Sequence, residues 1–426
     1  MSPAARKGRA HAPVLLAMAY TAGGTPASEN DTMSASLTNT LDSILHYTVG
    51  NAGGAPGVVA MACDRSGNFY EGAAGKRQLG QNAAMTTDSV MLLASCTKAV
   101  TGVAVMQLVE EGLVALDDPA KKYVPEIAEC RVLTGFDAAG QPQLRPPKRD
   151  ITLRHLMLHT AGMVYEFFSA DEARYRAAAG VPSVFASCYD AIKSVLVFDP
   201  GEGWAYGPNI DWLGRIVEAV RGKSLGDVFR ERIFAPLGMQ DIAFEMSPSM
   251  RARLAVVHQR APDGQLTAVP DLVLPQPPVM EMGGHGLYST IGEYMKFIRM
   301  ILNDGDGPHG RVLQAKTVEA MAQNGLGDMK CSAWQSAMPP LANSGDFFPG
   351  LSKSWAYTFQ VIDEDAPTGR PAGSLHWAGI ANCYYWIDRR NGIGGMWGSQ
   401  VLPFMDVGSY PGFVEFESAI YRARRR

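Results

Sequence analysis

The sequence predicts an α+β fold with one antiparallel sheet that is built from both ends of the chain and flanked by helices. Short runs of β character occur at residues 58–64 and 68–74, and they return between residues 354 and 397. Stretches of helical character near both ends, residues 36–49 and 414–424, are placed to cover such a sheet. The chain between the two groups of strands is mainly helices and loops.

These boundaries suggest a division into parts. Residues 1–32 read as a leader or disordered extension, and residues 33–85 and 345–426 form an α/β sheet domain. Residues 86–344 form an inserted, mostly helical domain, which carries the Ser-x-x-Lys helix and the loop with the candidate tyrosine. A chain of 426 residues has ample length for a large core of this kind.

The strands are separated by turn residues. Ser66-Gly67 is placed to turn the early hairpin, and Arg390-Asn391-Gly392 is a strong signal for a hairpin late in the chain. The late strands are expected at residues 355–362, 374–377, 383–388 and 392–397.

The middle of the chain carries helix signals with recognisable starts and stops. Threonine or aspartate precedes two of the helical stretches, and glycine follows two of them, as capping requires. In order, the expected elements are a helix within residues 150–158 capped by Asp150 or Thr152 and stopped by Gly162, a helix at 210–220 stopped by Gly222, a surface loop at 261–278, and a helix at 290–302 with Thr290 and Glu293 as a capping box.

Composition excludes several classes of protein. The net charge of −4 argues against nucleic acid as a partner, because the basic clusters lie only at the two ends. No apolar run is long enough to span a bilayer. The six cysteines are scattered without metal-binding or disulfide-framework spacing, which fits a reducing compartment.

The first residues allow two interpretations. Arg6, Lys7 and Arg9 precede a modest apolar stretch at residues 12–22, which resembles a signal peptide. We favour the alternative, an extension ahead of a start at Met33, because Ala, Tyr and Thr dilute the apolar stretch. A cytoplasmic location follows from the second interpretation, and a periplasmic or secreted one if residues 1–27 act as a signal peptide.

Ser95 and Lys98 are the first candidate catalytic pair. They open the run SCTKAVTGVAVMQLVEEG (95–112), which predicts a buried amphipathic helix, and residues three apart share a helix face. A serine hydroxyl needs a base to become a nucleophile, and a desolvated lysine can supply one because its pKa falls.

Two further motifs supply candidate groups. Tyr206 lies in a tight loop before a helix, where a nearby ammonium and the helix dipole would favour its phenolate form and proton transfer with serine. In the strand motif Leu375-His376-Trp377-Ala378-Gly379-Ile380, small residues allow a substrate carbonyl to approach the backbone. A backbone amide there and that of Ser95 could form an oxyanion hole. His376 is an alternative general base or a structural edge residue.

Other patterns favour structural roles. Gly222-Lys223-Ser224-Leu225-Gly226 has the letters of a nucleophile elbow but follows a helix instead of a strand, so Ser224 is expected to be a helix cap. His155 and His159 are four apart but lack the inner glutamate of a zinc motif, and structural roles are expected. An aromatic group, Tyr165, Phe167 and Phe168, is placed to wall an acyl pocket or to fill the core.

Together these motifs resemble the serine β-lactamase and penicillin-binding-protein superfamily over roughly residues 40–420. The SCTK, YGPN-DWLG and HWAG segments occur in its order and rough spacing. Framing phrases also match, namely LRHLMLHTAG (153–162), FAPLGM (234–239) and GGHGLYST (283–290). Within the superfamily, the chain is similar to the class C-like branch, the family VIII carboxylesterases and the related fungal acyltransferases of statin precursors.

The resemblance implies a β-lactamase-like fold and specific roles. Ser95 matches the acylated nucleophile, Lys98 its base partner and Tyr206 the tyrosine of the Tyr-x-Asn motif. Trp377-Ala378-Gly379 matches the strand motif, which is Lys-Thr-Gly in β-lactamases and Trp-Gly-Gly in the esterases, and Ile380 would supply the second oxyanion amide.

Two departures from the family pattern bear on the substrate. Pro208 stands two residues after the tyrosine, with Asn209 shifted by one position. Trp377 replaces the strand lysine that helps to hold the carboxylate of a β-lactam, which favours uncharged esters.

The sequence therefore predicts a serine carboxylesterase that acts on short-chain, small-molecule esters through an acyl-enzyme, without metal or organic cofactor. A β-lactamase, a D-amino-acid peptidase and an acyltransferase of the same fold are the alternatives. A catalytically dead binding protein is disfavoured because Ser, Lys and Tyr occur together. The immediate base, Lys98 or Tyr206, is left open, as are the acyl group, the alcohol and the choice between hydrolysis and transfer.

Overall fold

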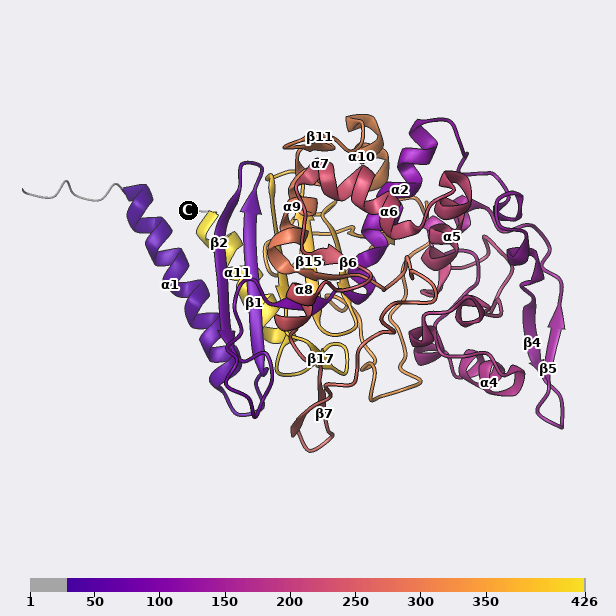
Figure 1. Cartoon of the computed structure of the whole chain (residues 1–426), viewed down its shortest axis with the longest axis horizontal. Coiled ribbons are helices and arrows are strands. Elements are labelled where there is room, and N and C mark those ends of the chain that lie inside the picture. Colours follow the sequence, from indigo (N-terminus) through magenta and orange to yellow (C-terminus); the bar gives the residue numbers. More distant parts are fainter. Residues whose placement is uncertain (1–28, 425–426) are drawn as a thin grey trace, which may run out of the picture.

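The computed structural model describes residues 29–424 (Figure 1). The predicted leader therefore lies outside the described residues, apart from residues 29–32, which already belong to helix α1 (Glu29–Gly50). None of the helices within residues 29–424 has both the length and the apolar character needed to cross a bilayer.

A seven-stranded sheet contains strands from both ends of the chain, as predicted. Its order is β12-β13-β14-β15-β16-β1-β2, and neighbouring strands run antiparallel. The junction lies between β16 and β1, where Val59 pairs with Gly398 and Asp64 with Ile393. The strands are β1 (Gly57–Asp64), β2 (Asn68–Gly75), β12 (Lys353–Trp355), β13 (Gln360–Ile362), β14 (Leu375–Gly379), β15 (Cys383–Asp388) and β16 (Ile393–Gly398).

One predicted strand is in fact two. The stretch 355–362 was expected as a single run, but it contains the turn between β12 and β13. In that turn the amide of Ala356 donates to the carbonyl of Phe359 at 2.8 Å. The two short strands then pair with each other, Trp355 opposite Gln360.

Helices cover both faces of the sheet (Figure 1). The terminal helices α1 and α11 (Tyr410–Arg424) pack on one face, where the ring of Phe416 lies 5.9 Å from that of Trp397. Helix α9 (Ile291–Leu302) packs on the other face against β1 and β16. At Gly394 on β16 a Cβ atom would lie only 2.7 Å from Ile298 of α9, so this glycine permits the close approach.

The middle of the chain is mainly helical, with small sheets that the sequence did not predict. These are β3-β9-β6, the β4–β5 hairpin, the pair of β10 (Asp306–Gly307) with β11 (Gly310–Arg311), and β7-β8, to which β17 from the later part of the chain adds. The strands are β3 (Val90–Leu92), β4 (Val132–Phe136), β5 (Pro142–Arg145), β6 (Ile242–Ala243), β7 (His258–Arg260), β8 (Leu266–Ala268), β9 (Tyr288–Thr290) and β17 (Val401–Leu402). The helices are α2 (Thr97–Glu110), α3 (Leu153–Met157), α4 (Ala170–Ala179), α5 (Asn209–Arg221), α6 (Leu225–Phe229), α7 (Ala235–Leu237), α8 (Pro248–Ala252) and α10 (Ala315–Ala322).

The caps agree with the sequence in part. Thr152 caps α3, and Gly222 ends α5 in the left-handed conformation at φ 64°. Thr290 caps α9, but the predicted capping box is incomplete. The carboxylate of Glu293 accepts from Lys296 and from the amide of Gln240 instead of reaching back to the cap.

Helix α2 is buried, as predicted, but over residues 97–108 it is buried on every side, so the expected amphipathic character is wrong. Residues 97–108 are all buried, because α2 lies in the interior against α5 and α6. Its polar side chains find internal partners. The Thr101 hydroxyl donates to the carbonyl of Gly283 at 2.6 Å, and Gln107 donates to the carbonyls of Arg232 and Val312. A helix enclosed in this way is a core element that can hold a side chain away from water.

A buried ion pair ties the last helix to the loop before β14. Arg370 and Glu417 have side chains that are 1% and 0% exposed, and Nη2 of Arg370 donates to Oε2 of Glu417 at 2.8 Å. Removing one partner of such a pair leaves a charge buried without compensation.

We predict that Glu417→Gln lowers the free energy of unfolding by about 3–5 kcal/mol, as measured by urea denaturation. Glu415 of the same helix forms an exposed ion pair with Arg422, so Glu415→Gln is the matched control and should leave stability essentially unchanged. Equal effects of the two substitutions would contradict the assignment of the buried pair as the anchor.

Candidate active site

Ser95 lies at a sharp junction between a strand and a helix. It is the middle residue of a 3-10 turn, Ala94–Cys96, that joins the end of β3 to the start of α2. Ala94 has φ 45°, a conformation that is uncommon for a residue with a side chain. This turn presents the half-buried Ser95 to a cavity.

The structure brings Lys98 to Ser95 as the spacing predicted. The ammonium nitrogen of Lys98 is 3.1 Å from Oγ of Ser95, 3.0 Å from Oη of Tyr165 and 2.7 Å from the carbonyl oxygen of Gly284. The Lys98 side chain is completely buried. Burial disfavours the charged form and lowers the pKa of Lys98 to about 7, so a substantial fraction is neutral near neutral pH.

Asp211 moderates this effect. It is a fully buried residue of α5, and its negative charge raises the pKa of Lys98 against the effect of burial. Its Oδ1 also accepts from the amide of Gly284 at 2.7 Å, so Asp211 and Lys98 bind the same residue, one at its N–H and the other at its carbonyl. A Cβ atom on Gly284 would lie 2.4 Å from Oδ2 of Asp211, which explains the glycine.

Tyr206 lies beside this pair as a neutral phenol. The indole Nε1 of Trp377 donates to its Oη at 2.9 Å, and the Lys98 nitrogen lies 4.8 Å from the centre of its ring. Burial raises the pKa of Tyr206 above its usual value, although the contacts with Ser95 and Trp377 lower it. The expected phenolate is therefore corrected, since burial outweighs these two contacts.

Strand β14 brings the predicted oxyanion segment to the serine. A Cβ atom on Gly379 would lie 2.2 Å from the carbonyl oxygen of Leu93, so only glycine allows β14 to lie this close to the turn that carries Ser95. Ala378 and Ile380 line the same cavity as Ser95. The strand thus places Ile380, the residue that follows Gly379, at the same cavity as Ser95.

The cavity in front of Ser95 has a volume of about 260 Å³ and mostly apolar walls, to which aromatic side chains contribute most of the bulk. Ser332 and Gln335 are among its few polar residues, and within residues 29–424 neither a lysine nor an arginine lines it. The aromatic side chains are Phe167, Phe168, Trp204, Tyr206, Trp334, Trp377 and Phe404.

His376 lies outside this cavity, so its place among the predicted substrate-binding residues is corrected. Neighbouring residues of a strand point to opposite faces, and Trp377 occupies the face toward the site. The ring of His376 packs against Phe347 at 5.1 Å and is buried, and burial lowers its pKa well below the usual value. It is a core residue and not a base for Ser95.

The two histidines of the His155–His159 pair, and Asn209 of the shifted Tyr-x-Asn motif, make structural contacts. Nδ2 of Asn209 lies 2.8 Å from Nδ1 of His159, so this asparagine binds the histidine and not Ser95. The His159 ring in turn packs 4.9 Å from Tyr206. Nδ1 of His155 accepts from the amide of Thr152. Within residues 29–424 no group of His, Cys, Asp and Glu is arranged to hold a metal ion.

Ser224 has the structural role that its context predicts. It is exposed and caps α6, where its hydroxyl accepts from the amide of Asp227 at 3.2 Å. The nucleophile-elbow pattern around it is therefore a helix start.

The sequence did not single out Tyr165 and Asp211 as partners of Lys98, or Gly284 as an acceptor. The signals were present, because Asp211 belongs to the DWLG segment and Gly284 to GGHGLYST, but both were used only as framing motifs. Tyr165 was expected to wall a pocket, whereas its hydroxyl binds Lys98.

Comparison with known proteins shows the family to which the chain belongs. Residues 37–408 match the family described as beta-lactamase, and the chain belongs to that family. Its fold is the β-lactamase-like fold that the resemblance implied.

Individual relatives and a solved structure indicate which activities occur among similar proteins. The chain is 34% identical to lovastatin esterase from Penicillium rubens, over 82% of this chain and 89% of the relative. It is 32% identical to monacolin J acid methylbutanoyltransferase from Aspergillus terreus, over 86% and 91%. A solved mutant of simvastatin synthase from Aspergillus terreus superimposes with a TM-score of 0.79 at 29% identity, covering 94% of this chain and 100% of that one. Relatives of the chain are thus esterases and acyltransferases, which supports an enzyme.

We predict that Asp211→Asn moves the acid limb of the pH profile to lower pH. If neutral Lys98 is the active form, kcat/KM on a nitrophenyl ester rises with pH through about 7 in the native protein. Removing the negative charge removes the influence that raises the pKa of Lys98, while the asparagine oxygen can still accept from Gly284.

The control for this experiment is Asp227→Asn, which changes an exposed carboxylate of α6 that pairs with Arg230. It should leave the acid limb in place. A limb that stays fixed or moves to higher pH in Asp211→Asn would contradict the electrostatic role of this carboxylate.

Proposed function

We propose that this protein is a serine carboxylesterase that forms an acyl-enzyme on Ser95. The observation that supports this best is the contact of 3.1 Å between the hydroxyl of Ser95 and a completely buried lysine with a pKa of about 7. A base of this pKa accepts a proton near neutral pH and gives it back readily. Ser95 lines a cavity large enough for a small ester, and Lys98 lies buried behind it.

The proposed reaction assigns each group a step. Neutral Lys98 takes the proton from Ser95 as Oγ attacks the ester carbonyl, and the amides of Ser95 and Ile380 stabilise the oxyanion. Tyr206 keeps its phenol proton and donates it to the leaving alkoxide, in keeping with its raised pKa. In the second half-reaction water attacks the acyl-enzyme, and the proton transfers run in reverse.

The walls of the cavity favour apolar, uncharged substrates. Aromatic side chains dominate the lining, and no lysine or arginine of residues 29–424 is among the lining residues. Burying a carboxylate there without a charge partner is unfavourable. Short acyl chains on an apolar alcohol fit these requirements, and lovastatin esterase among the relatives is consistent with such an ester.

Acyl transfer is the second candidate. A relative of comparable similarity is a methylbutanoyltransferase, and transfer uses the same acyl-enzyme with an alcohol in place of water. Product analysis with an added alcohol distinguishes the two, since hydrolysis releases the acid and transfer forms a new ester.

We predict that Ser95→Ala lowers hydrolysis of nitrophenyl butyrate by at least about a thousandfold, because the nucleophile is lost. Ser224→Ala is the control, since it changes another serine in a motif-like context, and it should retain most of the activity. Near-native turnover by Ser95→Ala would refute the assignment of the nucleophile.

We also predict a higher kcat/KM for nitrophenyl butyrate than for a penicillin. Trp377 occupies the position of the β-lactamase lysine, and its single N–H is already donated to Tyr206. It therefore offers no charge and no free donor to the penicillin carboxylate. Parity or a preference for the penicillin would contradict the esterase proposal and favour a β-lactamase.

A further inference from the structure

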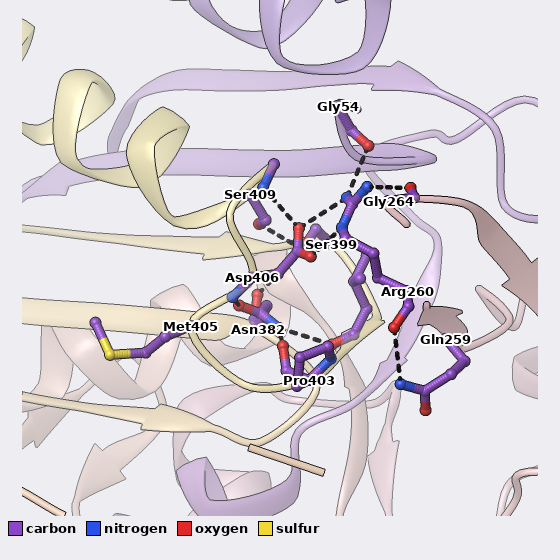
Figure 2. A network of polar contacts seen from close by, with 12 residues as sticks. Gly54, Gln259, Arg260, Gly264, Asn382, Ser399, Pro403, Met405, Asp406 and Ser409 are labelled. Atoms are coloured by element: carbon purple, nitrogen blue, oxygen red, sulfur yellow. Dashed lines mark hydrogen bonds and ion pairs between the residues drawn. The ribbon is translucent and has the colours of Figure 1, made fainter. Parts of the chain in front are cut away.

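One loop binds both backbone segments that lead to the proposed oxyanion amides. Residues 399–406, here called the clamp loop, follow β16 and contain the short strand β17 (Val401–Leu402) and Phe404 of the cavity wall. Figure 2 shows the loop curled around the side chain of Asn382. Two amide side chains, Asn382 and Gln400, make the connections.

Asn382 connects the clamp loop to the segment that carries Ile380. It lies two residues after Ile380, is fully buried and has φ 60°. Its Nδ2 donates to the carbonyls of Val401 at 2.7 Å and Pro403 at 2.9 Å, and its Oδ1 accepts from the amide of Asp406 at 2.9 Å (Figure 2). The turn after β14 is thereby held in one conformation.

Gln400 connects the same loop to the segment that carries Ser95. Its Oε1 accepts from the amide of Leu92 at 3.0 Å, and its Nε2 donates to the carbonyl of Leu92 at 3.2 Å. Leu92 ends β3, and only Leu93 separates it from the turn that carries Ser95. Gln400 is fully buried, so these bonds have no competition from water.

The clamp loop is itself anchored by a buried ion pair. Nη2 of Arg260 donates to Oδ1 of Asp406 at 3.0 Å, and Arg260 also donates to the carbonyls of Gly54 and Gly264 (Figure 2). The side chains of Arg260 and Asp406 are 6% and 0% exposed. Strand β7, which carries Arg260, also pairs with β17 of the loop. The clamp loop is therefore anchored to the rest of the fold independently of the segments that carry Ser95 and Ile380.

We propose that the clamp loop fixes the separation of the Ser95 and Ile380 amides, with Asn382 and Gln400 as the positioning residues of the oxyanion hole. The inference rests on the proposed function, because it concerns the same acyl-transfer site. An oxyanion hole requires its two donors at fixed positions before the charge develops, and a misplacement of about 1 Å is costly. Neither side chain lines the cavity, so each acts through the backbone that it holds.

The test compares a nitrophenyl ester with the thionoester in which sulfur replaces the carbonyl oxygen. Sulfur is a weak hydrogen-bond acceptor and gains little from the two amides. Asn382→Gly keeps the positive φ but removes the side-chain bonds, and Gln400→Met removes both bonds at similar length. We expect each to lower kcat on the oxygen ester by about 10- to 100-fold, somewhat less than the loss of a whole oxyanion donor, with KM within about threefold.

The same variants should lower the ratio of oxygen-ester to thionoester kcat/KM by at least about fivefold, because only the oxygen ester loses oxyanion stabilisation. Gln107→Met is the matched control. Gln107 is also a buried amide, and its Nε2 donates to the carbonyls of Arg232 at 2.9 Å and Val312 at 3.0 Å. This variant should lower the melting temperature while leaving kcat and the substrate ratio unchanged.

The outcomes separate the inference from the proposed function. If Gln400→Met and Asn382→Gly slow both substrates equally, or slow neither, the positioning role is refuted while the esterase proposal stands. If only one of them folds, that variant decides by the same ratio. If the native protein shows no turnover that depends on Ser95, the proposed function fails, and this inference fails with it.

Discussion

The site depends on one energetic constraint, the complete burial of a lysine side chain. An ammonium group in a protein interior lacks the hydration that stabilises it in water. Burial therefore shifts the equilibrium toward the neutral amine and lowers the pKa of the lysine. In this chain the Lys98 nitrogen keeps three partners, and Asp211 supplies a compensating charge from a neighbouring helix. The balance brings the pKa of Lys98 to about 7, where the residue can serve as base and acid in turn.

The rest of the molecule holds that lysine and its serine in place. Helix α2 packs against α5 and α6 in the interior, and the side chain of Lys98 is completely buried there. Glycine at positions 284 and 379 lets two backbones approach closely enough to reach Lys98 and Ser95. The sheet joins the two ends of the chain, so strand β14 from residue 375 onward lies beside a turn at residue 94. Local geometry at the serine is thus a consequence of contacts between distant segments.

Sequence patterns predicted what depends on local spacing. Ser95 and Lys98 meet because residues three apart share a helix face, and the sheet was predicted from short runs of β character separated by turn residues. Tyr165, Asp211 and Gln400 could not be assigned, since their partners are distant in sequence and depend on tertiary packing.

Other predictions failed because both sides of an element are buried. On β14 the pattern of residues does not say which face meets the site, so His376 was placed there although Trp377 faces it. The helix α2 was expected to be amphipathic, but its polar residues Thr101 and Gln107 both bind internal carbonyls. The predicted phenolate of Tyr206 failed for a related reason, because its degree of burial is not visible in the sequence.

The most direct test of the central claim is to measure the pKa of Lys98 itself, by NMR titration of the protein labelled with ¹³C and ¹⁵N at the lysine side-chain termini. The spectrum of Lys98→Arg assigns the signal. We expect the Lys98 signal to titrate with a midpoint near 7, whereas a midpoint near the usual value of about 10.4 would contradict its role as a neutral base.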